Sequence, residues 1–181
     1  MQISTSRQTD PNDPLTFVFF TGNAATGSNY GIETDFNYQV NESFDLYGSL
    51  GLLRAQFDDF VTTEGDFNGR DQAHAPQYNF SFGAQYHTLN GFFVRLDANG
   101  KDSFFFSDSH QQQSKSYQLY NLRVGYENDH WSVTLWGNNI FNKQYATRGF
   151  YFGLEPPNYE NKLYTQLGSP RHMGISFDYE F

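Results

Sequence analysis

The sequence contains no cysteine and no long run of apolar residues. Without cysteine, neither a disulfide framework nor a thiolate metal site can form. The apolar runs are short, as at residues 17–20, whereas a membrane-spanning helix needs about 20 consecutive, mostly apolar residues. A transmembrane helix is therefore excluded.

Positive charge is scarce as well. The chain has 11 Lys and Arg residues against 20 Asp and Glu residues, which gives a net charge of −9 and a pI of about 4.8. This balance argues against a nucleic acid as partner, because its phosphates attract basic surfaces. The first ten residues also lack the apolar core of a signal peptide, which an exported protein should carry. We therefore expect residues 1–14 to be a truncated or disordered lead-in.

Aromatic residues are abundant, at 19% of the chain with 20 Phe and 13 Tyr, although the mean hydropathy is only −0.67. Many aromatics combined with low mean hydropathy are typical of alternating strands with aromatic girdles at a membrane boundary. An aromatic-rich soluble β-sandwich fits the same totals. Composition alone leaves both architectures open.

The last residues show the clearest pattern. Large apolar side chains fall at every second position, and the residues between them are small or charged: Met173, Ile175, Phe177, Tyr179 and Phe181, separated by Gly174, Ser176, Asp178 and Glu180. A period of two predicts a β-strand with one apolar face and one polar face.

The same alternation predicts about eight strands, at residues 15–21, 30–40, 44–57, 78–86, 92–98, 120–126, 131–139 and 170–181. Tight connections at 41–43, 88–91 and 127–130 alternate with long ones at 22–29, 58–75, 105–116 and 142–169. Such asymmetry is typical of outer-membrane barrels. We therefore predict an all-β fold, a transmembrane antiparallel meander β-barrel, although a soluble antiparallel sheet would alternate in the same way.

Two stretches resemble a known family. The pattern W-x-V-x-L-x-x-x-N-L-F-(D/N)-K-x-Y is matched, with Ile140 in place of the leucine, by Trp131, Val133, Leu135, Asn139, Phe141, Asn142, Lys143 and Tyr145. Residues 168–174 match G-x-P-R-x-x-G. Both patterns resemble the C-terminal β-barrel portion of TonB-dependent outer-membrane receptors. The resemblance spans residues 15–181 and implies the last third of a barrel of about 22 strands.

The resemblance also implies a function, the energised uptake of a scarce nutrient across the outer membrane of a Gram-negative bacterium. The nutrient is most often a ferric siderophore, and cobalamin, haem and glycans are others. The implied partners are outer-membrane lipid, the barrel-assembly machinery and, through N-terminal parts that this chain lacks, the TonB complex. The assembly machinery would read the C-terminal strand at Ile175, Phe177, Tyr179 and Phe181.

Substrate contacts are expected in the connection 142–169. It combines an arginine with several aromatic side chains that could hold an iron chelate: Arg148, Phe150, Tyr151, Phe152, Tyr159 and Tyr164. The same side chains could instead pack the loop on itself. The charges expected on the polar face would pair with one another or with a plug in the barrel lumen: Glu33, Asp35, Arg95, Asp97, Arg123, Asp178 and Glu180.

No motif points to catalysis. The sequence has no G-x-S-x-G elbow, no Gly-rich phosphate loop and no cysteine nucleophile, and its five histidines are scattered. The acidic loop around Asp66 lacks the spacing of a calcium site. We expect no enzyme activity, catalytic residue, metal site or cofactor. Two alternatives stay open: a self-contained eight-stranded outer-membrane barrel with a structural or adhesive role, and a soluble β-domain that binds a ligand.

Overall fold

The computed structural model describes residues 2–10, 12–13, 15–23, 26–62 and 65–180. These ranges contain strands and connections but no helix, so no helix in them could span a membrane. The strands are β1 (Gln2–Gln8), β2 (Phe17–Asn23), β3 (Thr26–Asn41), β4 (Phe44–Asp59), β5 (Val61–Thr62), β6 (Gly65–Asp66), β7 (Tyr78–His87), β8 (Phe92–Lys101), β9 (Tyr117–Glu127), β10 (Trp131–Asn138), β11 (Ala146–Phe152), β12 (Lys162–Leu167) and β13 (His172–Tyr179).

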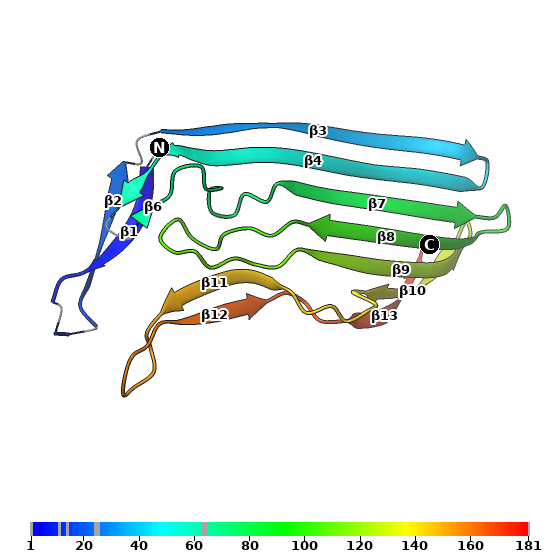
Figure 1. The fold of residues 1–181 in the computed structure, drawn as a ribbon. Coiled ribbons are helices and arrows are strands. Elements are labelled where there is room, and N and C mark those ends of the chain that lie inside the picture. The colour runs from blue at the N-terminus through cyan, green and yellow to red at the C-terminus, as the bar shows by residue number, and fades with distance from the viewer. Residues whose placement is uncertain (1, 11, 14, 24–25, 63–64, 181) are drawn as a thin grey trace.

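Seven strands form one antiparallel sheet in the order β13-β10-β9-β8-β7-β4-β3 (Figure 1). Neighbouring strands follow one another along the chain, except that two small strand pairs are inserted: β5–β6 between β4 and β7, and the β11–β12 hairpin between β10 and β13. The predicted all-β antiparallel meander is thereby confirmed. Within the described residues the sheet is open, with β3 and β13 as its two edges.

The tight turns and the C-terminus lie at one end of the sheet, and the long connections lie at the other (Figure 1). Backbone hydrogen bonds join neighbouring turns: the Glu127 amide donates to the Gly91 carbonyl and the Glu180 amide to the His130 carbonyl, both at 2.9 Å. The predicted alternation of tight and long connections therefore corresponds to two different ends of the molecule.

The strand register separates two faces. Directly opposed residues in antiparallel strands lie on the same face, and Trp131 opposes Tyr179 just as Leu135 opposes Ile175. The face they share, called the apolar face, carries Tyr30, Ile32, Phe36, Tyr38 and Val40 of β3, Leu46, Leu50 and Leu52 of β4, Tyr78, Phe80, Phe82 and Tyr86 of β7, Phe92, Val94 and Leu96 of β8, Tyr120, Leu122, Val124 and Tyr126 of β9, Trp131, Val133 and Leu135 of β10, and Met173, Ile175, Phe177 and Tyr179 of β13.

The apolar face is not covered by any other part of the described chain. Ile175 is 70% exposed and Leu135 is 54% exposed. A soluble sandwich would bury such a face against a second sheet, whereas a membrane strand presents it to lipid. The β7 and β8 strands have ten residues each, which matches the roughly 9–11 residues of a membrane-spanning strand.

The β3 and β4 strands are longer than predicted, with 16 residues each. Residues 26–29 were expected in a loop because Gly, Ser and Asn are unfavourable in strands, yet Ser28 opposes Gln56 and Asn29 opposes Ala55. Pairing with β4 outweighs the local preference. These two strands therefore extend past the others toward the long connections (Figure 1).

The segment 15–21, predicted as the first strand of the sheet, is not part of it. It corresponds to β2, which pairs with β1 in a separate two-stranded sheet. The main sheet therefore has seven strands, and its edge is β3. Strand β1 lies within residues 1–14, where a polar lead-in was expected.

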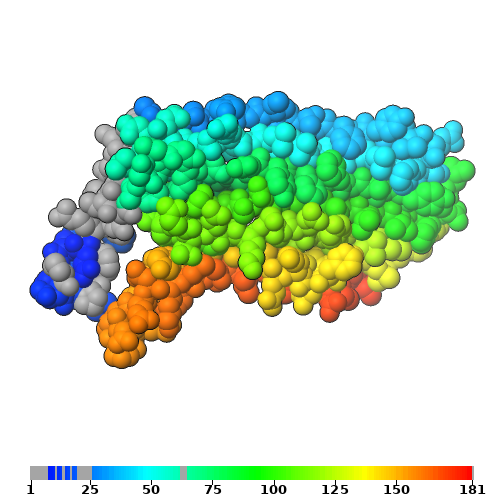
Figure 2. Space-filling model, viewed as in Figure 1, coloured from blue at the N-terminus to red at the C-terminus, as the bar shows by residue number. Residues whose placement is uncertain are grey.

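Two predicted loops contain regular structure. The connection 142–169 forms the β11–β12 hairpin, which projects from one end of the molecule (orange in Figure 2). The connection 58–75 includes β5 and β6, and its residues Phe60 and Phe67 form a small apolar core with Phe57 of β4, all at most 5% exposed. The rings of Phe57 and Phe60 lie 4.6 Å apart. This core lies at the end of the main sheet that carries the long connections, and not between the apolar and polar faces of that sheet.

Candidate functional site

The polar face of the sheet carries an ordered charge cluster. Arg95 donates to both carboxylate oxygens of Asp97 at 3.1–3.2 Å, and the Tyr47 hydroxyl donates to Asp97 at 2.7 Å. The Arg95 guanidinium also lies 4.7 Å from the centre of the Tyr47 ring. The ring covers Gly83, where a Cβ atom would come within 2.2 Å of Tyr47 Cζ. Three neighbouring strands are thus tied together on this face.

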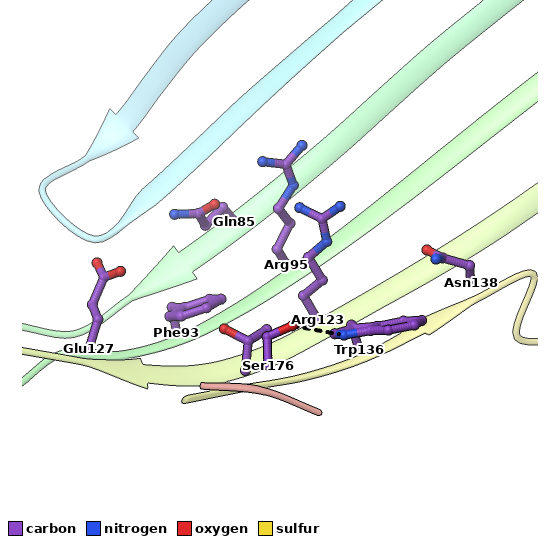
Figure 3. A pocket seen from close by; sticks show the side chains of 9 residues that line it. Gln85, Phe93, Arg95, Arg123, Glu127, Trp136, Asn138 and Ser176 are labelled. Carbon is purple, nitrogen blue, oxygen red and sulfur yellow. Dashed lines mark hydrogen bonds between the residues drawn. The ribbon is translucent and has the colours of Figure 1, made fainter. Parts of the chain in front are cut away.

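A hollow of about 480 Å³ lies next to this cluster. Its floor is formed by Phe93 and Trp136, and the Trp136 indole N–H donates to Ser176 at 3.1 Å (Figure 3). Arg95 and Arg123 stand directly opposite one another on β8 and β9, and both point away from the sheet (Figure 3). The hollow is further lined by Gln85, Glu127, Thr134 and Asn138.

Two like charges directly opposed across strands repel. Asp97 neutralises Arg95, whereas Arg123 has no ion pair within the described part of the chain. The hollow is thus lined by charges of both signs, Arg95 and Arg123 on one side and Glu127 as the anionic member. Of the charges predicted to pair with one another there, Arg95 and Asp97 do so, and the other predicted ones form no ion pair among the described residues: Glu33, Asp35, Arg123, Asp178 and Glu180.

At the opposite end, three segments form what we call the loop crown: the described part of residues 60–77 (60–62 and 65–77), residues 102–116 and the β11–β12 hairpin. Its centre is Arg70, whose side chain is only 7% exposed. The Arg70 guanidinium lies 4.4 Å from the Phe67 ring and 4.6 Å from the Phe105 ring. It donates to the carbonyls of His110 and Ser107 at 3.0 and 3.4 Å. Arg70 thereby joins the first two segments.

The hairpin packs on the same cluster through one of its faces. The Phe106 ring lies over Gly149, where a Cβ atom would come within 2.3 Å of it. The His110 and Tyr151 rings are 5.7 Å apart. The crown is thus a packed unit, although residues 58–75, 105–116 and 142–169 were predicted only as long connections. Its signal was the aromatic content of the segments, Phe60, Phe67, Phe104, Phe105 and Phe106.

The structure divides the predicted substrate contacts. Arg148, Phe150 and Phe152 alternate along one face of β11, and Phe150 opposes Tyr164 of β12. Tyr151 lies on the other face, against His110, and Tyr159 lies in the turn between the strands. The Phe152 and Tyr164 rings are 5.5 Å apart. Four of the six predicted side chains, Arg148, Phe150, Phe152 and Tyr164, therefore share one surface.

An exposed charge cluster closes the tip of the hairpin. Lys162 and Tyr164 both donate hydrogen bonds to the Glu155 carboxylate, Tyr164 at 3.0 Å. These two hydrogen bonds lower the pKa of Glu155. Among the described residues, no three His, Cys, Asp or Glu side chains are grouped as a metal site.

The predicted assembly signal lies on β13, with Ile175, Phe177 and Tyr179 exposed on the apolar face. Phe181 is outside the described residues. Tyr47 was not among the residues predicted for a site. The available signal was an aromatic residue at a polar-face position, between Leu46 and Gly48.

Acid is expected to loosen the loop crown through His110. Burial, and then the nearby Arg70 charge, lower the pKa of His110 from its ordinary value of 6.5. The opened loop therefore binds a proton more readily than the packed loop. Moreover, His110 Nδ1 accepts a hydrogen bond from the Gln112 amide at 3.2 Å, and protonation at Nδ1 would remove that acceptor.

The crown should accordingly have its full stability above about pH 6.5 and lose it as the pH falls below that value. Hydrogen exchange of residues 102–116, corrected for the chemical effect of pH, measures this. The His110→Asn variant keeps an acceptor near the Gln112 amide but cannot titrate, so its protection should not change with pH. An equal acid response in both proteins would contradict the assignment to His110.

Comparison with known proteins places this fold. A family model described as "TonB dependent receptor-like, beta-barrel" matches residues 2–140, more than half of the chain. Among solved structures, the ferric yersiniabactin uptake receptor FyuA from Yersinia pestis matches with a TM-score of 0.71 at 17% identity, over 90% of this chain and 25% of that one. The siderophore receptor PiuA from Acinetobacter baumannii matches with a TM-score of 0.67 at 16% identity, over 96% of this chain and 24% of that one.

The copper transporter OprC gives a TM-score of 0.69 at 14% identity, over 99% of this chain and 26% of that one. The chain thus spans about a quarter of the length of these structures. Identity this low shows a shared fold only. The family match rests on the sequence itself and covers the strands that carry both faces of the sheet up to β10. The chain therefore belongs to the TonB-dependent receptor-like β-barrel family.

Proposed function

We propose that the chain forms C-terminal wall strands, within residues 15–181, of an outer-membrane receptor that takes up a scarce nutrient of the ferric siderophore class. One observation carries this proposal: a seven-stranded sheet with an exposed apolar face and a polar face bearing ordered charges. Such a sheet is suited to separate lipid from a water-filled or plugged lumen. Family membership and the similarity to siderophore receptors support the substrate class.

The directions of the two edge strands show that this sheet needs further strands to close. β3 ends at the tight-turn end of the sheet, and β13 ends there as well. The two edges therefore run in the same direction and could close on each other only as a parallel pair. Because bacterial single-chain barrels are antiparallel with an even number of strands, an odd number of further strands is needed between them. A barrel that contains these seven strands therefore has at least one more strand.

The crown supports uptake of a chelate. The surface shared by Arg148, Phe150, Phe152 and Tyr164 offers one cation and three aromatic rings. Aromatic faces bind planar ligand rings, and arginine binds anionic oxygen atoms. We assign the substrate contacts to this surface. Contact with the TonB complex is proposed to fall on receptor segments outside these strands, and recognition by the barrel-assembly machinery to fall on β13.

The two tryptophans provide the test, because they lie on opposite faces. Trp131 opposes Tyr179 on the apolar face, and Trp136 opposes Gly174 on the polar face. The chain would be reconstituted into vesicles whose lipids carry brominated acyl chains, which quench fluorescence on contact. We expect strong quenching in the Trp136→Phe variant, which retains Trp131, and weak quenching in the Trp131→Phe variant.

Acrylamide in the aqueous phase should show the reverse order, because Trp136 faces the polar side. Each variant serves as the matched control of the other. Equal bromine quenching of both, or a chain that folds in plain buffer without lipid, would refute the membrane-wall proposal and favour a soluble β-domain.

A further inference from the structure

The connection that carries the β11–β12 hairpin begins at Asn139. This residue directly follows β10, is only 4% exposed and has a φ of 49°. Asparagine tolerates this left-handed backbone conformation better than most residues with a Cβ atom. The Asn139 amide donates to the Asn121 side chain of β9 at 3.0 Å, and Asn121 opposes Asp97 on the polar face. Asn139 is therefore fixed to the wall strands at the point where the connection leaves them.

The Asn139 side chain joins the two ends of this connection. Its carboxamide oxygen accepts a hydrogen bond from the Lys143 amide at 2.8 Å. Its nitrogen donates to the Lys143 carbonyl at 2.9 Å and to the Ser169 carbonyl at 3.1 Å. The two N–H groups of the carboxamide are thereby used, one on the outgoing segment and one on the returning segment. A single buried side chain thus closes the base of the hairpin.

Two further contacts close the same base. The Arg171 amide donates to the Asn142 side chain at 3.1 Å. The Gly168 amide donates to the Tyr145 carbonyl at 2.9 Å, and the Tyr145 ring covers Gly168, where a Cβ atom would come within 2.0 Å of Tyr145 Cζ. We call these contacts, together with those of Asn139, the hairpin clamp. The two family sequence patterns meet in this clamp, although the hairpin separates them along the chain.

The place of the assigned substrate surface depends on the clamp. β11 extends from Ala146 to Phe152, and a strand of that length reaches about 20 Å at about 3.3 Å per residue. A change of about 10° in its direction would move Phe152 by about 3 Å, which is enough to lose a hydrogen bond or a ring contact. Small changes at the base of the hairpin therefore become large displacements of the side chains near its tip.

We propose that Asn139 is a positioning residue for substrate binding. It fixes the direction of the hairpin relative to the wall, and with it the place of Arg148, Phe150 and Phe152. The ligand class for this surface is an iron(III) chelate with aromatic rings and anionic oxygen atoms. Asn139 does not contact the chelate but raises the fraction of chains whose hairpin is ready to bind, and the apparent affinity scales with that fraction. The assignment rests on the proposed function.

Spin labels can report the direction of the hairpin, because the chain has no cysteine that would compete for labelling. The labels are attached to Asn158→Cys in the hairpin turn and Gln118→Cys on β9, both exposed positions. Pulsed electron paramagnetic resonance of the reconstituted chain then gives the distribution of distances between them. Asn139→Gly adopts a positive φ without strain but lacks the carboxamide. We expect a narrow distribution with Asn139 present and a broad one in Asn139→Gly.

Binding of an iron(III) tris-catecholate complex is measured on the same reconstituted proteins by equilibrium dialysis with radioactive iron. Asn139→Gly should weaken binding about tenfold, which corresponds to a binding-ready fraction of about one tenth. Asn139→Asp keeps the acceptor for the Lys143 amide and should restore part of the affinity. Asn128→Gly is the matched control, because it loses side-chain hydrogen bonds to the His130 and Trp131 amides at the tight-turn end. It should bind like the unsubstituted protein.

The two measurements separate the possible failures. A distribution in Asn139→Gly as narrow as that of the unsubstituted chain overturns the proposal, as does unchanged binding by Asn139→Gly or an equal loss of binding in Asn128→Gly. In these cases the unsubstituted chain still binds the complex, so only the positioning role is refuted. If the unsubstituted chain is inserted, as bromine quenching of Trp131 reports, but does not bind the complex, the proposed substrate class is refuted together with the positioning role.

Discussion

Replacement of Gly91 by alanine should destabilise the sheet by about 3 kcal/mol or more. Gly91 ends the tight turn between β7 and β8 with a φ of +90°, a conformation that residues with a Cβ atom rarely adopt. A Cβ atom there would lie 1.9 Å from the carbonyl oxygen of Glu127. The Glu127 oxygen is a backbone atom, and a Cβ atom is attached directly to the backbone. Side-chain rotation therefore cannot relieve the clash.

The contact between Gly91 and Glu127, which the added Cβ atom would displace, also holds two turns together. The Gly91 carbonyl accepts the Glu127 amide at 2.9 Å, and the Gly91 amide donates to Thr88 at 3.1 Å. Separating the turns therefore weakens the β8–β9 pairing next to them. Urea unfolding of the reconstituted chain, followed by tryptophan fluorescence, measures the loss.

Gly69 provides the matched control. It also has a positive φ, +74°, but a Cβ atom at this position would meet nothing within 4 Å. Gly69→Ala should therefore cost only the backbone strain, about 1 kcal/mol. Equal losses at the two positions would show that strain alone, and not the contact between the turns, decides the effect at Gly91.

Replacement of Arg70 by methionine should open the loop crown, with a loss of about 3 kcal/mol in its local stability. Methionine retains much of the packing volume but removes the cation that lies between the Phe67 and Phe105 rings. It also leaves the carbonyls of Ser107 and His110 without their donor. Hydrogen exchange should accelerate in residues 60–77 and 102–116 while the main sheet stays protected.

Arg54→Met is the control for loss of an arginine as such. Arg54 is exposed, and its guanidinium lies 6.0 Å from one ring, so its loss should leave crown exchange nearly unchanged. Arg70→Lys keeps the charge but not the planar fork that reaches both carbonyls, so we expect an intermediate effect. If hydrogen exchange of the crown is as slow in Arg70→Met as in the unsubstituted protein, the phenylalanine core alone holds the crown.

The candidate sites differ in how much of them could be predicted. Arg95, Asp97 and Arg123 were assigned to the polar face from alternation alone, since a strand position determines the face. Arg95 and Asp97 are two residues apart on one strand, but the contact of Tyr47 with Asp97 and the position of Arg123 opposite Arg95 depend on the register of three strands. Likewise, Arg70 lies in an acidic, Gly-containing segment, and its ring partners include a residue 35 positions away, Phe105.

The sequence by itself determined the approximate positions of the seven strands in the main sheet, the apolar and polar faces and the placement of tight turns. These follow from the period of two and from turn residues such as Asn90-Gly91, which act within a few residues of each other. Only the tertiary structure decided which strands share the sheet. It excluded β2, extended β3 and β4, and ordered the connections around Phe57 and Arg70. The physical reason is that backbone pairing and ring packing between distant segments outweigh local preference, and local alternation carries no information about such partners.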